Sequence, residues 1–423
     1  MDLLLVGGGG REHAIAKKLR ENETVDKIYV LPGNGGMTDV ATPVPEIGAK
    51  DLGKIVAFAK EKKVDFAVVA PDDPLVLGLV DLLEEAGIPA FGPKKNAAII
   101  EGSKAFSKAL MKKYGIPTAK YEVFTEESAA LSYIDKVGAP VVVKADGLAL
   151  GKGVVVAETV EEAKTAVCEM MEKGKFGDSG KTVVIEEFLE GPEVSVLSFT
   201  DGKVVLPMVS SMDHKRAKDG DKGLNTGGMG AVAPNPYYTE EIAEVCRKTI
   251  FEPTIAAMNA EGRTFRGCLY FGLMLTSSGP KVIEYNCRFG DPETQAVLPL
   301  LKSDLLTVMQ KTAAGKLQPS DVQFSDDASC CVVLSSDGYP EKYATGYEIS
   351  LPEEEGFLID VAGAKIKDGK LVTAGGRVLG VVAVRKDLKN AIGAAYRAAS
   401  GVQFANAFYR KDIGKRALAA LKK

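Results

Sequence analysis

The sequence predicts a multidomain chain of mixed α/β and α+β class, whose N-terminal part forms a doubly wound parallel sheet. The chain has 423 residues, and domains of about 150 residues would give it about three domains. Within residues 1–102, short apolar strands alternate with helical stretches, which is typical of a parallel sheet. Farther along, strands follow one another directly, which favours antiparallel pairing.

The expected elements group into three domains. Residues 1–102 form the first, residues 103–317 the second and residues 326–423 a small α+β domain. Periodicity and breaker residues predict the elements in order. In the first domain we expect strands at 2–6, 27–31, 66–70 and 88–91 and helices at 12–21, 52–62 and 76–86. In the second we expect helices at 103–113, 160–172 and 240–260, and strands at 141–144, 154–157, 183–187, 193–200, 203–208, 267–276 and 281–285. In the third we expect strands at 329–334 and 377–384 and helices at 388–399 and near the C-terminus.

Composition excludes several classes of function. The formal net charge is −4, which argues against nucleic acid as a partner. Because there are only two histidines, His13 and His214, a multi-histidine zinc site is impossible. We expect no membrane span and no signal peptide, since the apolar runs are short and no basic region precedes them. Six scattered cysteines indicate reduced thiols and a cytoplasmic location.

Glycine is enriched, and its clusters suggest backbone that approaches a ligand closely. The chain has 45 glycines, where average usage of about 7% predicts about 30. The first cluster, 7–10, follows a strand and opens a helix, so its amides could hold a phosphate. A dinucleotide fingerprint is disfavoured because Glu12 or His13 occupies its third glycine position and no acid ends the second strand. A plain tight turn stays open, and we expect His13 to be a partly buried histidine satisfied by a neighbour.

A second glycine cluster joins two apolar strands and carries two lysines. Lys144 ends the first strand, and Gly147, Gly151, Lys152 and Gly153 follow. The segment does not match a Walker A loop, because Asp146 and Gly153 stand where glycine and Ser/Thr are needed. We therefore expect a strand–loop–strand flap over a triphosphate, with Lys144 near a phosphate oxygen. Solvated lysines are the alternative, more so for Lys152.

A strand at 281–285 is followed by polar residues and suggests a metal site. Period-two alternation places Val282, Glu284, Asn286 and Arg288 on one face, and Ile283 and Tyr285 on the other. A carboxylate and an amide oxygen suit a hard cation such as Mg²⁺. Arg288 could stabilise a phosphoryl group during transfer.

Several motifs together give the sequence a family resemblance. The lysines, the glycine flap and the Glu284/Asn286/Arg288 set occur in the order of the ATP-grasp superfamily. More closely, the chain resembles the glycinamide ribonucleotide synthetase family over nearly its whole length. The motifs that carry this resemblance are Gly9-Gly10-Arg11-Glu12-His13-Ala14, Glu101-Gly102-Ser103-Lys104-Ala105-Phe106, Lys144-Ala145-Asp146-Gly147-Leu148-Ala149, Asp213-His214-Lys215-Arg216, Asn225-Thr226-Gly227-Gly228-Met229-Gly230 and Asn286-Cys287-Arg288-Phe289-Gly290-Asp291-Pro292-Glu293-Thr294-Gln295.

The resemblance implies an ATP-grasp fold with a Rossmann-like domain before it, a mobile lid at about 118–190 and a small C-terminal α+β domain. It also implies a reaction in which ATP, glycine and 5-phosphoribosylamine give glycinamide ribonucleotide, ADP and phosphate through glycyl phosphate, in purine biosynthesis. Transient contact with neighbouring enzymes of that pathway is expected. Because catalysis is positioning and charge neutralisation, no protein nucleophile is required.

The resemblance also implies roles for individual residues. Arg288, Lys144 and Asp213 are the expected catalytic residues, and Glu284 and Asn286 are expected to hold Mg²⁺ or Mn²⁺. ATP is expected to contact Lys104, Lys144, Gly151, Gly153, Glu186, Glu187, Phe188, Leu189 and Glu193. The glycine and phosphoribosylamine pocket is expected to include Gly9, Gly10, Arg11, Glu12, Asp213, His214, Lys215, Asn225, Gly227, Gly228, Asp291 and Thr294.

The chain departs from the family pattern at a few positions, and other functions stay open. Ala70-Pro71-Asp72 stands where many members have Gly-Pro-Glu, and Leu150 and Leu224 replace the commoner Ala and Pro. Strand 267–276 carries no acid, so the ligands of a second metal ion are undefined. The alternatives are another ATP-grasp ligase or carboxylase, an NAD-linked oxidoreductase and a non-catalytic ATP-binding regulator.

Overall fold

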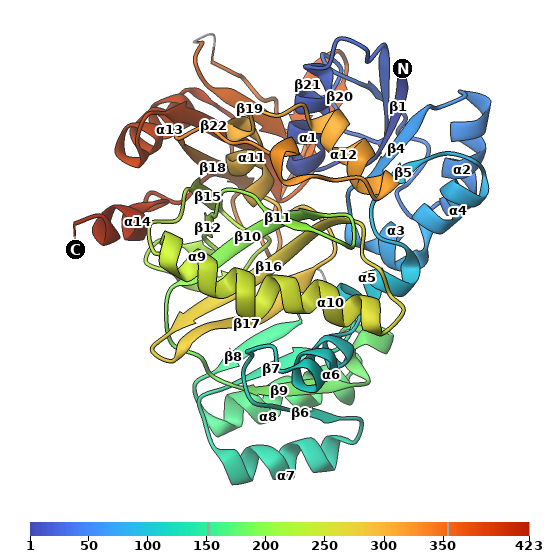
Figure 1. The fold of residues 1–423 in the computed structure, drawn as a ribbon. Helices are drawn as coiled ribbons and strands as arrows, with labels where there is room; N and C mark the ends of the chain where they lie inside the picture. The colour runs from blue at the N-terminus through green and yellow to red at the C-terminus, as the bar shows by residue number, and fades with distance from the viewer. Residues whose placement is uncertain (150–152, 353–354, 423) are drawn as a thin grey trace.

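The structure is a computed structural model that describes residues 1–149, 153–352 and 355–422. The N-terminal and C-terminal parts of the chain lie side by side at one end, and the expected lid lies at the opposite end (Figure 1). A central antiparallel sheet lies between them (Figure 1). This arrangement confirms the predicted class, a parallel N-terminal sheet followed by antiparallel sheets.

The N-terminal sheet is parallel, with strand order β3-β2-β1-β4-β5. Leu4 and Leu5 of the central strand belong to different core clusters, so both faces of the sheet are covered, as parallel sheets require. The expected helix at 76–86 is two helices, because Gly78 adopts a left-handed conformation with φ of 98°. The elements are β1 (Asp2–Gly7), α1 (Gly10–Arg20), β2 (Lys27–Pro32), β3 (Thr42–Pro43), α2 (Leu52–Glu61), β4 (Phe66–Val69), α3 (Asp72–Leu77), α4 (Leu79–Glu85), β5 (Ala90–Phe91) and α5 (Lys95–Gly102).

The lid is an antiparallel sheet of order β6-β9-β7-β8 with two helices packed together against it. Its core is separate from the others, which makes it a unit of its own. The β7–β8 pair confirms the expected strand–loop–strand, although residues 150–152 of the loop lie outside the described residues. The elements are β6 (Tyr121–Phe124), α7 (Glu127–Val137), β7 (Val141–Ala145), β8 (Val154–Ala157), α8 (Val160–Met171), η1 (Gly177–Gly180) and β9 (Val183–Glu187).

The central sheet has the order β11-β10-β16-β17. Its register shifts between Gly272 and Leu273, which pair with Glu284 and Val282, so Ile283 forms a bulge. The expected alternation is therefore wrong at Val282 and Ile283, because a bulge adds an unpaired residue and reverses the faces beyond it. Val282 packs in the same core cluster as Tyr285, whereas Ile283 faces the cleft. The elements are α6 (Lys104–Tyr114), β10 (Glu193–Thr200), β11 (Val205–Pro207), α9 (Glu240–Cys246), the π-helix η2 (Arg247–Phe251), α10 (Glu252–Ala260), β16 (Gly267–Thr276) and β17 (Gly279–Asn286).

The C-terminal sheet, of order β12-β15-β18-β22-β19, takes two strands from the middle of the chain. Strands β12 (Met212–Asp213) and β15 (Gly230–Ala233) bring the hairpin of β13 (Arg216–Lys218) and β14 (Lys222–Asn225) to the C-terminal part. The other elements are α11 (Glu293–Val297), η3 (Leu298–Leu300), α12 (Leu305–Ala314), η4 (Pro319–Asp321), β18 (Ala328–Ser336), β19 (Leu358–Val361), β20 (Ala364–Lys367), β21 (Lys370–Thr373), β22 (Arg377–Arg385), α13 (Leu388–Gly401), β23 (Ala407–Phe408) and α14 (Lys415–Ala420).

Two expectations from composition can be compared with the fold. Each of the six cysteines is free, including the neighbours Cys330 and Cys331. Among the described residues, no helix combines the length and the apolar character that crossing a membrane demands.

Candidate active site

A cavity of about 940 Å³ opens between the lid, the central sheet and the C-terminal part, and it gathers most of the expected site residues. Those that line it are Arg11, Lys104, Lys144, Gly153, Glu186, Glu187, Phe188, Leu189, Glu193, Asp213, Lys215, Asn225, Gly227, Glu284, Asn286, Arg288 and Asp291. Six expected residues are not in the lining, namely Gly9, Gly10, Glu12, His214, Gly228 and Thr294. Gly151 lies outside the described residues.

The start of helix α6 fixes Lys104 beside the flap. Ser103 caps the helix by accepting a hydrogen bond from the amide of Phe106 at 3.0 Å. The Asp146 carboxylate, at the end of β7, accepts hydrogen bonds from the Ser103 hydroxyl and from the amide of Ala105. The Lys104 ammonium donates to the carbonyl of Gly147 at 3.0 Å. Burial and the nearby Lys144 lower the pKa of Lys104. An anionic ligand beside this ammonium group would therefore stabilise its charge.

Glu186 lies between two buried lysines. Its carboxylate oxygens are 2.9 Å from the ammonium groups of Lys144 and Lys108. Sequence analysis missed Lys108, although Lys104 and Lys108 are four residues apart and share one face of α6. Burial lowers the pKa of Lys108 to about 8. We call this set, Lys104, Lys108, Lys144 and Glu186, the lysine-rich end of the cleft.

Glu284 and Asn286 both face the cleft, since both follow the bulge at Ile283. The bulge also frees the Ile283 carbonyl, which accepts a hydrogen bond from Lys144 at 2.9 Å. Burial alone would raise the pKa of Glu284, but Lys215 and Lys144 beside it lower the pKa to about 2. An ionised carboxylate and an amide oxygen on one strand are hard donors, so these two residues fit a divalent cation.

Arg288 is held by acids of the N-terminal part. Its guanidinium is 3.0 Å from the carboxylate of Glu101 and 3.9 Å from that of Asp72. It also donates to the amide oxygen of Asn286 at 3.2 Å. Its Nε atom is buried and has no hydrogen-bond partner within the described part of the chain. A buried donor without a partner is costly, so this atom suits an acceptor supplied by a ligand.

The opposite part of the cleft is rich in acids. Asp213, Asp291 and Glu293 line it, and we call these three the acid-rich end. Burial and the neighbouring Glu293 raise the pKa of Asp213 well above its usual range. Lys215 lies between the two ends, with its ammonium 3.2 Å from Glu284 and 3.9 Å from Glu193. Glu293 was missed as a site residue, although it falls inside a motif that the sequence displayed.

The N-terminal glycine loop contributes to the cleft through Arg11. The amide of Gly9 donates to the Glu12 carboxylate at 2.6 Å, so Glu12 caps its own helix. The amide of Arg11 donates to Asp291 at 3.4 Å, and its guanidinium donates to the carbonyl of Phe289 at 2.9 Å. This loop therefore joins the N-terminal sheet to the acid-rich end.

Both histidines are buried, and each accepts a hydrogen bond from a backbone amide that is distant in sequence. The Nδ1 of His13 accepts from the amide of Val361 at 2.8 Å, whereas its Nε2 is buried without a hydrogen-bond partner in the described part of the chain, so the expectation of a satisfied histidine holds for one nitrogen only. The Nε2 of His214 accepts from the amide of Gly414, and its Nδ1 donates to the carbonyl of Gly230. Burial lowers the pKa of His13 to about 3 and that of His214 to about 4. With both nitrogens bonded to the backbone, His214 supports the fold around Asp213 and Lys215.

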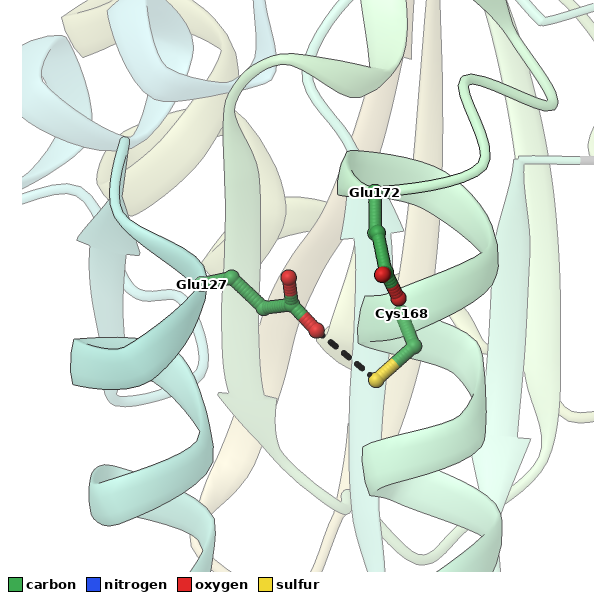
Figure 2. Close-up of side chains that lie close together, drawn as sticks. All are labelled: Glu127, Cys168 and Glu172. Atoms are coloured by element: carbon green, nitrogen blue, oxygen red, sulfur yellow. Dashed lines mark hydrogen bonds between the residues drawn. The ribbon is translucent and has the colours of Figure 1, made fainter.

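A separate cluster lies between the two lid helices, where Glu127 of α7 points toward Cys168 of α8, and Glu172 lies just after the last residue of α8 (Figure 2). The Cys168 thiol donates to the Glu127 carboxylate at 2.9 Å. This hydrogen bond raises the pKa of Cys168, so the thiol stays protonated. None of the three residues lines the cleft.

Three family models match successive parts of this chain. The model of the phosphoribosylglycinamide synthetase N domain matches residues 1–101. The model of the ATP-grasp (A) domain of that synthetase matches residues 102–294, and the model of its C domain matches residues 329–416.

Named relatives are similar over almost the full chain. The phosphoribosylamine–glycine ligase of Halalkalibacterium halodurans is 50% identical over 99% of this chain and 98% of its own length. The trifunctional purine biosynthetic protein adenosine-3 of Gallus gallus is 46% identical over 99% of this chain and 42% of its own length. The crystal structure of the phosphoribosylamine–glycine ligase of Thermotoga maritima has a TM-score of 0.83 at 36% identity, covering 98% of this chain and 100% of that one.

Proposed function

The chain belongs to the phosphoribosylglycinamide synthetase family of ATP-grasp ligases, and we propose that its cleft joins glycine to 5-phosphoribosylamine with ATP. The products are glycinamide ribonucleotide, ADP and phosphate, in purine biosynthesis. One observation carries the proposal: a single cavity holds Lys104 and Lys144, the pair Glu284 and Asn286, and the acid-rich end. Cations for phosphates and acids for an amine thus lie in one cleft.

The first step activates the carboxylate of glycine. A glycine oxygen attacks the γ-phosphorus of ATP, the bond to the β–γ bridging oxygen breaks, and ADP leaves. Lys104 and Lys144 contact the phosphates, and Arg288 stabilises the phosphoryl group as it transfers. The strand end at Glu186, Glu187, Phe188 and Leu189 receives adenine, Glu193 the ribose, and Gly153 of the flap covers the phosphates. The burial of Lys144 supports its role, since charge is stabilised more strongly out of water.

Glu284 and Asn286 hold Mg²⁺ or Mn²⁺ in this proposal. The low pKa of Glu284 supports the role, because a carboxylate ligand has to be ionised. A divalent cation at this place would neutralise negative charge on the ATP phosphates.

The second step forms the amide. The amine of phosphoribosylamine attacks the carbonyl carbon of glycyl phosphate, the carbon–oxygen bond to phosphate breaks, and the amine loses a proton. Asp213, Asp291 and Lys215 orient the two substrates, with Asn225 and Gly227 at the edge of the pocket, and Arg11 contacts the 5′-phosphate. Gly9, Gly10, Glu12, His214, Gly228 and Thr294 support this pocket from behind its lining. The three acids of this end support binding of the glycine ammonium group.

The setting of the reaction is also part of the proposal. We place the enzyme in the cytoplasm, in transient contact with neighbouring enzymes of purine biosynthesis. The six free cysteines support the location. The fused relative in Gallus gallus, named as a trifunctional purine biosynthetic protein, supports the contact.

A coupled assay tests the proposed function. The protein is mixed with ATP, Mg²⁺, glycine and freshly made phosphoribosylamine, and ADP is measured with each component omitted in turn. ADP formation that needs both co-substrates, together with glycinamide ribonucleotide by mass spectrometry, is the expected result. ADP formed with bicarbonate or another acid in place of glycine would favour a different ATP-grasp ligase or carboxylase and overturn the assignment.

A further inference from the structure

The C-terminal part of the chain reaches into the cleft through one arginine. Arg377 is the first residue of β22, and its side chain lines the cleft. One terminal nitrogen of its guanidinium donates to the carbonyls of Gly227 and Asp291, both at 2.8 Å, and approaches the carbonyl of Gly228 at 3.3 Å. The same nitrogen is 3.3 Å from the Asp291 carboxylate.

These contacts connect two loops that are far apart in sequence. Gly227 and Gly228 belong to the loop at 225–230, and Asp291 begins the segment that follows β17 and leads into α11. Neither loop has a regular backbone partner for these carbonyls in the described sheets. Since buried carbonyls need donors, the guanidinium supplies the hydrogen bonds that a strand would otherwise give.

The packing around the loop leaves it little freedom. A Cβ atom on Gly227 would lie 2.8 Å from the guanidinium carbon of Arg377. A Cβ atom on Gly228, whose φ is 116°, would lie 2.3 Å from the ring of Pro292 and 2.7 Å from the Asp213 carboxylate. The amide of Gly227 donates to the hydroxyl of Tyr339 at 3.1 Å. The loop is therefore held on one side by Arg377 and Tyr339 and on the other by Pro292.

We propose that Arg377 is a positioning residue of the ligase reaction, which holds the loop at 225–230 against Asp291 and so shapes the acid-rich end. The inference rests on the proposed function, because it concerns where glycine and phosphoribosylamine bind. Reacting groups displaced by about 1 Å can lose about 100-fold in rate. The lysine-rich end shares none of these contacts and keeps its geometry without Arg377.

The test uses the full-length protein with Arg377→Met, Arg377→Lys and the control Arg385→Met. Arg385 ends the same strand and donates to the carbonyls of Gly356 and Val384, away from the cleft. We expect Arg377→Met to lower kcat/KM for glycine and phosphoribosylamine by about 100-fold, with the Kd for ATP within about twofold. Arg377→Lys should recover part of this loss, and Arg385→Met should match the wild type.

Hydrogen exchange separates this inference from the proposed function, because it needs no turnover. Amides at 226–230 should exchange faster in Arg377→Met, while those of β9 should keep the wild-type rate. Wild-type kinetic constants in Arg377→Met, unchanged exchange at 226–230, or faster exchange in β9 as well would each overturn the inference. If the wild type itself makes no ADP with both co-substrates, the proposed function fails, and the exchange data still decide the role of Arg377.

Discussion

The two ends of the cleft are built in different ways. The lysine-rich end consists of side chains paired with one another, with Glu186 between Lys108 and Lys144, and all of them lie on α6, β7 and β9. The acid-rich end consists of carboxylates, among which Asp213 has a raised pKa and Asp291 is paired with Arg377. Arg377 also holds the backbone of the loops that carry them. The first end is thus stabilised by charge pairing within one region. The second depends on contacts of Arg377 with segments 150 and 86 residues away in sequence.

Glu284 lies between the ends, so its removal should have the largest effect. Glu284→Gln removes the ionised ligand and leaves Lys215 without its nearest partner. We expect kcat to fall on the order of 10³-fold, with cooperative thermal unfolding retained. Steady-state ADP formation measures the loss, and Glu122→Gln, on an exposed position of β6, is the control. Wild-type turnover in Glu284→Gln would remove this residue from the proposed metal site.

The charge pairing of the lysine-rich end can be broken with Glu186→Gln. Removing one partner from a buried ion pair costs about 3–5 kcal/mol of unfolding free energy, and here two lysines lose their partner. We also expect weaker ATP binding and an unchanged KM for glycine. Urea unfolding and calorimetry measure the two effects, and Glu122→Gln should stay within about 0.5 kcal/mol of the wild type. A Glu186→Gln protein as stable as that control would contradict the paired arrangement.

Asp213→Asn tests the acid-rich end, where we expect weaker binding of glycine and unchanged binding of ATP. Asparagine keeps an oxygen that can accept from the amide of His214 but cannot ionise. We expect the KM for glycine to rise by about 10- to 100-fold, while the Kd for ATP stays unchanged. Together with Glu186→Gln, this variant gives a crossed pattern of effects on the two substrates. A rise in both constants in both variants would show that the two ends are not separate.

Because His214 is buried beside the acid-rich end, we expect the free energy of unfolding to fall at acid pH. Because the folded state keeps His214 neutral, with a pKa of about 4 against 6.5 in the unfolded chain, its contribution to stability is complete above pH 6.5. It is lost as the pH falls from 6.5 toward 4, by roughly 2 kcal/mol between pH 7 and pH 5. Urea unfolding of the wild type and of His214→Gln measures it. On unfolding at pH 5, the wild type should take up about one proton more than His214→Gln does. Equal proton uptake in both proteins would refute the assignment.

Sequence reasoning succeeded where a motif is local. The flap strands were placed because apolar runs flank a glycine cluster, and Glu284 and Asn286 were placed on one strand face because alternation holds over these two residues. It failed at Val282 and Ile283, since a bulge depends on the partner strand β16 and leaves no sign in β17 alone. Lys108 could have been found from its four-residue spacing to Lys104. Arg377 could not, because neither of the loops it holds lies near it in sequence.

The sequence by itself determined the family, the strand–helix alternation of the N-terminal part and the residues that carry charge, since periodicity, glycine clusters and motifs are local properties of the chain. The tertiary structure decided which of those charges face one another. It placed β12 and β15 in the C-terminal sheet, enclosed Glu186 between two lysines and brought Arg377 to Gly227 and Asp291. The physical reason is that burial and pairing act through distance in space, which packing of remote segments sets and which spacing along the chain does not encode.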